Sequence, residues 1–181
     1  MGPIRVHEFT TLDGVVDAPT WTMPYGFDPK MGEAIAGAMG GCDGILLGRT
    51  TFEMFEPAWS ARTADEDPGA PFMNDTDKYV VSSTLTGTTW RNSSVLGPYD
   101  PGTIRALKEK VAGGLYVSGS ATLVRWLLRQ RLLDQLDLLL FPLVVGGGKR
   151  LFDGDAGRVA LGLTGCHAFS NGVLHLTYRP D

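Results

Sequence analysis

The sequence predicts a single α/β domain built on a mostly parallel sheet with helices on both faces. Short apolar stretches alternate with segments of helical spacing along all 181 residues, a length that suits one domain. Near the end of the chain, two apolar stretches flank an Asn171-Gly172 pair, which predicts an antiparallel hairpin at one edge of the sheet. Ligands of such sheets bind beyond the carboxyl ends of the strands, so those corners are where a site is expected.

Composition and charge bound the classes of partner. Hydrophobic residues make up 43% and charged residues 20%, and the formal charge of −4 argues against binding nucleic acid through phosphate contacts. The longest apolar run, residues 136–145, contains Asp137 and Pro142 and does not predict a membrane span. Cys42 and Cys166 form no close-spaced motif, and the first residues do not resemble a signal peptide. We therefore expect a cytoplasmic protein without nucleic-acid or membrane partners.

The first elements follow from turn and cap signals. The stretch 4–14 begins as a short strand and ends in a turn marked by Asp13-Gly14. After a loop rich in aromatic residues, Asp28-Pro29 begins a helix, with Asp28 as its N-cap, and Gly40-Gly41 ends it.

A second strand, over residues 44–47, turns into a helix at Gly48. Thr50 and Glu53 have the spacing of a capping box at the start of that helix. The polar and acidic residues 60–77 predict an irregular loop.

The second half of the chain continues the alternation. The sequence predicts a strand over 78–85, a minor strand over 94–97 and a helix in the segment 100–114. A strand that turns into a helix follows over 115–128, and a long apolar strand over 134–148 ends in glycines.

Two of the predicted strand-to-helix corners are made almost entirely of small or hydroxylated residues. Such a corner lets backbone N–H groups approach a ligand, and the helix N-terminus adds positive potential, which favours phosphate. Arg49 adds a planar cationic fork, and two serines at the end of a third strand add hydroxyl donors. Glycine corners also serve packing alone, but two corners with a Ser-Ser strand end suit a nicotinamide dinucleotide phosphate. The candidate cofactor-binding residues are Gly48, Arg49, Thr50, Thr51, Ser82, Ser83, Gly119, Ser120, Ala121 and Thr122.

Two common phosphate motifs are absent from the sequence. No G-x-G-x-x-G follows the first strand, which disfavours a standard Rossmann domain. The run Gly146-Gly147-Gly148-Lys149 is similar to a Walker loop, but Arg150 replaces the required Ser or Thr. This run either holds a substrate phosphate or simply ends a strand.

Several motifs, in this order along nearly the whole chain, resemble the dihydrofolate-reductase-like superfamily. They resemble more closely the stand-alone relatives of the C-terminal reductase domain of bifunctional riboflavin-biosynthesis deaminase-reductases. The resemblance implies a three-layer fold with a central sheet of about eight strands, NADPH as hydride donor, and a homodimer. The motifs are "TTLDG", "LLGRTTFEMF", "KYVVSSTL", "LYVSGSATLVRWLL" and "LLDQLDLLLFPLVVGGGKRLF".

The resemblance also assigns regions of the cofactor to positions of this sequence. It places the Gly48 corner near the cofactor phosphates, Ser82-Ser83 near the adenosine 2′-phosphate, and residues 119–122 around the pyrophosphate. The Asp13-Gly14 turn would lie beside the nicotinamide. Where dihydrofolate reductases carry paired glycines at the pyrophosphate corner, this chain has Gly119-Ser120, and it lacks a deaminase domain.

The function that these expectations support is an NADPH-dependent reductase. It would transfer hydride to a small heterocyclic or ribosylated substrate, as 5-amino-6-(5-phosphoribosylamino)uracil reductase does in riboflavin biosynthesis. Two alternatives remain: dihydrofolate reductase activity, and a nucleotide-binding module without turnover.

A reductase of this kind needs a proton donor and a surface for its substrate. Asp13, at a strand end, is the first candidate for the donor, and the alternative is an Asx turn that shapes the loop. Trp21 and Tyr25 could stack on a flat heterocycle, or pack in the core as aromatic residues commonly do. The three histidines lack metal-ligand spacing, so no metal site is predicted.

Overall fold

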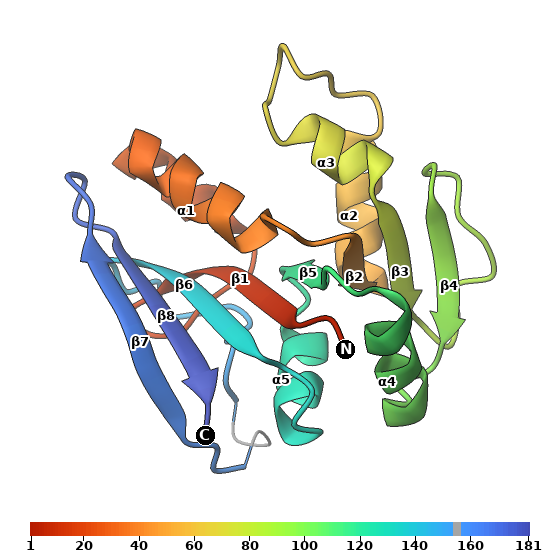
Figure 1. The fold of residues 1–181 in the computed structure, drawn as a ribbon. Coiled ribbons are helices and arrows are strands. Elements are labelled where there is room, and N and C mark those ends of the chain that lie inside the picture. The colour runs from red at the N-terminus through yellow and green to blue at the C-terminus, as the bar shows by residue number, and fades with distance from the viewer. Residues whose placement is uncertain (154–156) are drawn as a thin grey trace.

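The computed structural model describes residues 1–153 and 157–181 and has an eight-stranded sheet at its centre (Figure 1). The strand order is β4-β3-β2-β5-β1-β6-β8-β7. All pairs from β4 to β6 are parallel, whereas β8 runs antiparallel to both β6 and β7. The predicted parallel sheet with a C-terminal antiparallel hairpin is confirmed.

The elements alternate between strands and helices through most of the chain. In order, they are β1 (Ile4–Thr11), the 3-10 helix η1 (Pro19–Tyr25), α1 (Pro29–Met39), β2 (Gly44–Gly48), α2 (Arg49–Trp59), α3 (Ala70–Asp75), β3 (Asp77–Val81), β4 (Ser93–Gly97), α4 (Pro101–Lys110), β5 (Leu115–Ser118), α5 (Ala121–Arg129), β6 (Gln135–Phe141), β7 (Leu161–Ala168) and β8 (Leu174–Pro180).

Helices cover both faces of the sheet. On one face, Phe52 of α2 and Met73 of α3 pack on Ile45 and Leu47 of β2. The other face is covered by α4 and α5. Their side chains form a cluster with Leu46, the residue of β2 that lies between Ile45 and Leu47. Because successive strand residues point to opposite faces, the fully buried β2 contributes to both layers.

The order of the central strands brings distant parts of the chain to one edge. The chain places β1 and β2 first, and β5 later inserts between them and pairs in parallel with both. The carboxyl ends of β1, β2, β3 and β5 therefore meet at the same edge of the sheet, although more than a hundred residues separate the first from the last.

The segment 60–77 was predicted to be an irregular loop, and that prediction is wrong for residues 70–75. A short helix, α3, forms there and turns Asn74 into the protein interior, where it is 2% exposed. Its amide nitrogen donates to the carbonyls of Trp59 (2.9 Å) and Arg62 (3.1 Å), and its amide oxygen accepts from Nε1 of Trp90 (2.8 Å). These contacts link segments distant in the sequence, so no local pattern predicts them.

Two further local expectations differ from the structure. The capping box of Thr50 and Glu53 does not form, because α2 begins at Arg49 with Gly48 as its N-cap; Glu53 instead pairs with Arg49 at 3.2 Å. The strand expected over 134–148 ends at Phe141, before Pro142, which has no N–H to donate to a sheet ladder. The predicted N-cap role of Asp28 is confirmed by its bond from the N–H of Lys30 (2.9 Å).

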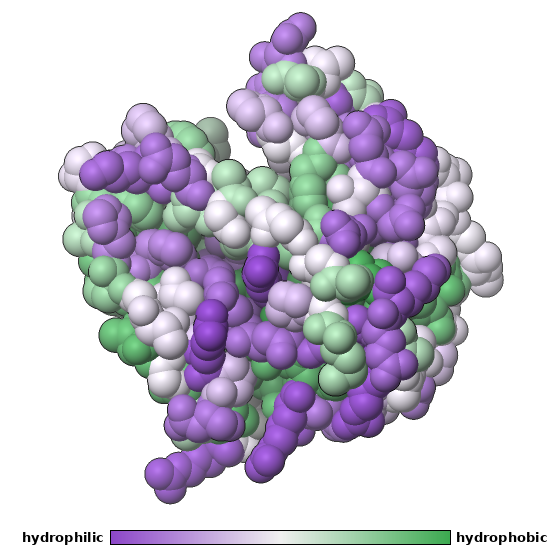
Figure 2. All heavy atoms as spheres, viewed as in Figure 1, coloured by the Kyte–Doolittle hydropathy of each residue, from purple (hydrophilic) through white to green (hydrophobic). Residues whose placement is uncertain are grey.

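In the view of Figure 1, the molecular surface is hollowed between α1 and α3 (Figure 2).

Within the described part of the chain, no helix combines the length and apolarity that a membrane span requires.

The buried amide of Asn74 gives a prediction for stability. Asn74→Ala removes partners from two carbonyls and one indole N–H, so we expect the free energy of unfolding to fall by roughly 2–4 kcal/mol. The neighbouring Asp75→Ala removes only the exposed ion pair with Arg91 (2.7 Å) and should cost no more than about 1 kcal/mol. Urea unfolding of both variants tests this. Equal losses in the free energy of unfolding would contradict the stabilising role of the Asn74 amide.

Candidate functional site

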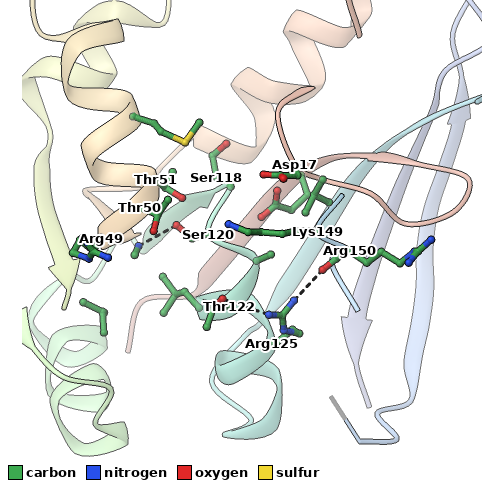
Figure 3. A pocket seen from close by; sticks show the side chains of 18 of the residues that line it. Asp17, Arg49, Thr50, Thr51, Ser118, Ser120, Thr122, Arg125, Lys149 and Arg150 are labelled. Atoms are coloured by element: carbon green, nitrogen blue, oxygen red, sulfur yellow. Dashed lines mark hydrogen bonds between the residues drawn. The ribbon is translucent and has the colours of Figure 1, made fainter. Parts of the chain in front are cut away.

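A cleft of about 970 Å³ opens at the carboxyl ends of the central strands (Figure 3). Its volume lies in the range of small-molecule sites, at the upper end. All ten residues predicted to bind a cofactor line this cleft, although they come from three separate parts of the chain: Gly48, Arg49, Thr50, Thr51, Ser82, Ser83, Gly119, Ser120, Ala121 and Thr122.

The two glycine corners meet directly. The backbone N–H of Gly48 donates a hydrogen bond of 3.0 Å to Oγ of Ser120, which lies 72 residues further along the chain. Figure 3 draws this bond as a dashed line between the start of α2 and the start of α5. The two corners therefore open onto the same cleft.

The Gly119-Ser120 corner has an unusual backbone. Both residues are left-handed, with φ of +63° and +61°, a conformation that costs a non-glycine residue roughly 1–2 kcal/mol. At Gly119, an added Cβ would lie 3.0 Å from Cγ2 of Thr51. The corner thus needs glycine at 119 for two reasons, conformation and the close approach of α2.

Neither helix N-terminus at the cleft is capped by the side chain of its N-cap residue. The N-cap of α2 is Gly48 and that of α5 is Ser120, whose hydroxyl is directed to Gly48 instead. The first N–H groups of both helices are consequently donors that a ligand can satisfy, and both helix dipoles favour an anion there.

Four basic side chains line the cleft against three acidic ones, although the whole chain carries −4. Arg49 lies on one side of the corner, and Arg125, Lys149 and Arg150 lie on the other (Figure 3). Arg49 pairs with Glu53, but both side chains are nearly half exposed, at 49% and 46%, so the pair is weak and Arg49 can turn to a ligand phosphate. The cleft therefore suits an anionic ligand with charge at more than one point.

Ser82 has a structural task in addition to its place in the cleft. Its hydroxyl oxygen accepts from the N–H groups of Thr84 (3.1 Å) and Leu85 (2.9 Å) and so shapes the turn after β3. Ser83 is exposed at the same turn. The sequence correctly predicted where these serines lie, and Ser83 is the more available donor of the two.

Asp13 lies outside the residues that line the cleft. Its carboxylate accepts from Oγ1 of Thr11 (2.6 Å) and from the N–H groups of Gly146 (2.9 Å) and Val145 (3.2 Å). Led by the Thr11 bond, these contacts lower the pKa of Asp13 from 3.8 to about 2. All of these contacts shape the turn, as in the Asx-turn alternative. A carboxyl group that stays ionised is also a poor proton donor.

The same contacts give a structural role to the glycine run at residues 146–148, whose sequence is similar to a Walker loop. The Asp13 carboxylate holds its first residue, Gly146, and a β-bridge joins Val15 to Arg150. Arg150 also pairs with Asp13 (3.6 Å). Lys149 lines the cleft and makes no ion pair in the described part of the chain (Figure 3).

Trp21 and Tyr25 also lie outside the lining of the cleft. Both rings pack edge-on against Phe141, with centroids 5.3 and 5.4 Å away. The Trp21 indole donates to the carbonyl of Asp17 (3.1 Å), and the Tyr25 hydroxyl to that of Pro142 (3.3 Å). These contacts match the core-packing alternative for both residues.

One buried carboxyl group in the cleft was not singled out by the sequence. Glu8, on β1, lines the cleft and is only 3% exposed, and its Oε1 has no hydrogen-bond partner. Burial raises its pKa well above 4.5, although the N–H of Gly119 donates to the carboxyl group and opposes that shift. The sequence predicts that residue 8 lies within the first strand. It does not show that β5 pairs with this strand and so brings Gly119 beside Glu8.

The described residues contain no group of three or more His, Cys, Asp or Glu arranged to hold a metal ion. Within them, the site offers hydrogen-bond donors and cations instead of metal ligands.

Comparison with known proteins identifies sequence relatives. The model of the RibD C-terminal domain family matches residues 3–175. The uncharacterized protein YyaP of Bacillus subtilis is 26% identical over 180 residues, covering 93% of this chain and 90% of YyaP.

Solved structures share the fold at low sequence identity. A Shewanella sp. PV-4 protein assigned to riboflavin biosynthesis has a TM-score of 0.81 at 19% identity, covering 100% of this chain and 99% of its own. The Thermotoga maritima diaminohydroxyphosphoribosylaminopyrimidine deaminase/5-amino-6-(5-phosphoribosylamino)uracil reductase has a TM-score of 0.69 at 15% identity, covering 99% of this chain and 57% of its own. Enterococcus faecalis dihydrofolate reductase, complexed with NADP(H), has a TM-score of 0.66 at 15% identity, covering 99% and 97%. The predicted dihydrofolate-reductase-like fold is confirmed.

The bond between the corners predicts a ranking of variants at Ser120. Ser120→Ala leaves the Gly48 N–H without its partner and should lower the free energy of unfolding by about 1–2 kcal/mol. Ser120→Gly loses the same bond but relieves the left-handed strain, so it should be about 1 kcal/mol more stable than Ser120→Ala. Urea unfolding measures both, and Ser83→Ala, at an exposed position, is the control. Equal stability of Ser120→Ala and wild type would contradict the role of the hydroxyl.

The lowered pKa of Asp13 predicts a pH dependence. A carboxyl group with a depressed folded-state pKa stabilises the fold above its unfolded value of 3.8, and that stabilisation is lost as the pH falls toward 2. Asp13→Asn should therefore be less stable than wild type at neutral pH, and the difference should shrink as the pH falls through this window. Thermal unfolding across the acid range tests this, and a difference independent of pH would exclude the charged interaction.

Proposed function

Because the chain belongs to the RibD C-terminal domain family, we propose that it is an oxidoreductase that binds NADPH and reduces a small heterocyclic or ribosylated compound. The observation that carries the proposal is the convergence of the two uncapped helix N-termini, joined by the Gly48–Ser120 bond, on one cationic cleft.

The parts of the cleft suit the parts of such a cofactor. The start of α5, at Gly119 and Ser120, offers backbone N–H groups for a pyrophosphate, and Arg49 with Ser83 offers a cation and a hydroxyl for a separate phosphate. NADPH carries phosphate groups at both kinds of position. When bound, it would supply the hydride, while this chain would hold the cofactor, orient it and exclude water.

The proposed substrate class follows from the reductase relatives. The Thermotoga maritima relative is named as a 5-amino-6-(5-phosphoribosylamino)uracil reductase, and this ribosylated compound is our first candidate substrate. Lys149, which reaches into the cleft opposite Arg49, provides a cation for a substrate phosphate (Figure 3). Dihydrofolate reduction remains the second activity to assay, and the homodimer stays a prediction.

NADPH binding to the glycine corner is the direct test. We expect saturable quenching of tryptophan fluorescence by NADPH, and we expect Gly119→Ala to weaken it by more than about tenfold, because its Cβ meets Thr51 in a left-handed backbone. Gly37→Ala, in α1, is the matched control, since its Cβ would meet no atom within 4 Å. Circular dichroism confirms that each variant is folded.

Arg49→Ala gives a second variant that leaves the fold intact, because residue 49 is exposed. Loss of a charge-assisted contact should weaken NADPH binding by about tenfold and NADH binding less. Wild-type protein that shows no saturable signal with either cofactor would sink the proposed function. Binding without turnover of either candidate substrate would favour the non-catalytic nucleotide-binding module.

A further inference from the structure

We propose that Glu8 is the proton donor of the reduction, acting as a neutral carboxylic acid at the end of the cleft away from Arg49. The assignment rests on the proposed function, because the reaction that needs this proton is hydride transfer. Among the described carboxyl groups that line the cleft, Asp17 and Asp153 are exposed, whereas Glu8 is buried.

The position of Glu8 follows from the strand order. Inserted β5 pairs with β1 so that His7 stands opposite Ser118, and Glu8 comes next to Gly119, whose N–H donates to its carboxyl group. Phosphate groups bound by α2, α5 and Arg49 would occupy one side of this corner. A cofactor held there by its phosphate groups would have its uncharged ring within reach of the other side, where Glu8, Phe9 and Val16 line the cleft.

The hydrogen bonds of Glu8 specify where its proton lies. We assign the proton of the neutral acid to Oε1, because this buried oxygen has no hydrogen-bond partner in the structure. An unpaired buried polar atom is costly and rare in folded proteins, which points to a use in the complete complex. A substrate nitrogen or oxygen that accepts this proton would supply the missing partner.

Charged groups around Glu8 leave it neutral. On the far side of β1, His7 is itself buried and burial lowers its pKa to about 4, so it carries no charge at neutral pH. Arg125 pairs with Asp153 (3.2 Å), Arg150 with Asp13 and Arg49 with Glu53, and Lys149 has no ion pair with Glu8. Burial is thus the main cause of the raised pKa of Glu8.

The proton transfer balances with the hydride. Hydride from bound NADPH would add two electrons and one hydrogen to an sp2 carbon of the substrate, and the π pair of the substrate's C=N or C=O bond would then form a new N–H or O–H bond. The O–H bond of Glu8 breaks to supply that proton, and the carboxylate left behind keeps its bond from the Gly119 N–H. A proton from water in the open cleft then restores the neutral acid.

Comparing the pH dependence of oxidised and reduced cofactor binding tests this assignment without a substrate. NADP⁺ carries a cationic ring that favours ionised Glu8, so its affinity should rise with pH, by up to about tenfold per pH unit, with proton release. NADPH has a neutral ring and should bind with little pH dependence. In Glu8→Gln the difference between the two cofactors should vanish, whereas in Thr10→Val, a buried change on the same face of β1, it should persist.

The turnover rate of Glu8 variants is the second test of the assignment. With 5-amino-6-(5-phosphoribosylamino)uracil as probe, Glu8→Gln should reduce kcat by about 10²- to 10⁴-fold while NADPH still binds, and Glu8→Asp should recover part of the loss. Undiminished turnover in Glu8→Gln, or equal pH dependence for NADP⁺ and NADPH in wild type, overturns the assignment but leaves the proposed function standing. Failure of wild type to bind NADPH overturns both.

A cofactor-free measurement checks that Glu8 is neutral. A carboxyl group with a raised folded-state pKa stabilises the fold fully below its unfolded value of 4.5, and this stabilisation is lost as the pH rises toward the folded value. Glu8→Gln should therefore gain in melting temperature over wild type as the pH rises above about 4.5. A gain that does not change with pH would show that Glu8 is ionised in the fold and would overturn the proposal.

Discussion

The hydrogen bond from the Gly48 N–H to the Ser120 hydroxyl is the contact on which the site depends. It can form only because β5 inserts between β1 and β2, which brings two strand-to-helix corners together. It also occupies the hydroxyl of the α5 N-cap, so that the helix keeps its first N–H groups available to a ligand. One side chain thus joins the two corners and leaves both dipoles directed at the cleft.

The opposite wall of the site is held by a second set of contacts. The Asp13 carboxylate links the turn after β1 to Val145 and Gly146, and the Val15–Arg150 bridge carries the chain back toward the cleft at Lys149. A residue that first suggests acid catalysis is therefore part of the frame. The buried acid lies five residues earlier, on the strand itself, where burial favours a neutral carboxyl group.

Patterns close in the sequence predicted the fold and the residues that line the cleft at its two corners. Alternating strands and helices, the small-residue corners and the Asn171-Gly172 turn are local signals, and parallel strands necessarily bring their carboxyl ends to one edge. Local signals failed where long-range contacts decide the structure. Asn74 makes α3 part of the interior through partners at 59, 62 and 90. For Trp21 and Tyr25 the sequence left two alternatives open, and the structure shows both rings packed against Phe141. Glu8 was missed because its neighbour Gly119 is more than a hundred residues away.

The proposed function requires both backbone corners to bind the same phosphorylated cofactor, and amide resonances report on both corners at once. In a ¹H–¹⁵N titration with NADPH, we predict saturable shifts with a common dissociation constant for the amides of residues 48–51 and 119–122. Shifts at only one of the two segments, or at neither, would contradict a shared site.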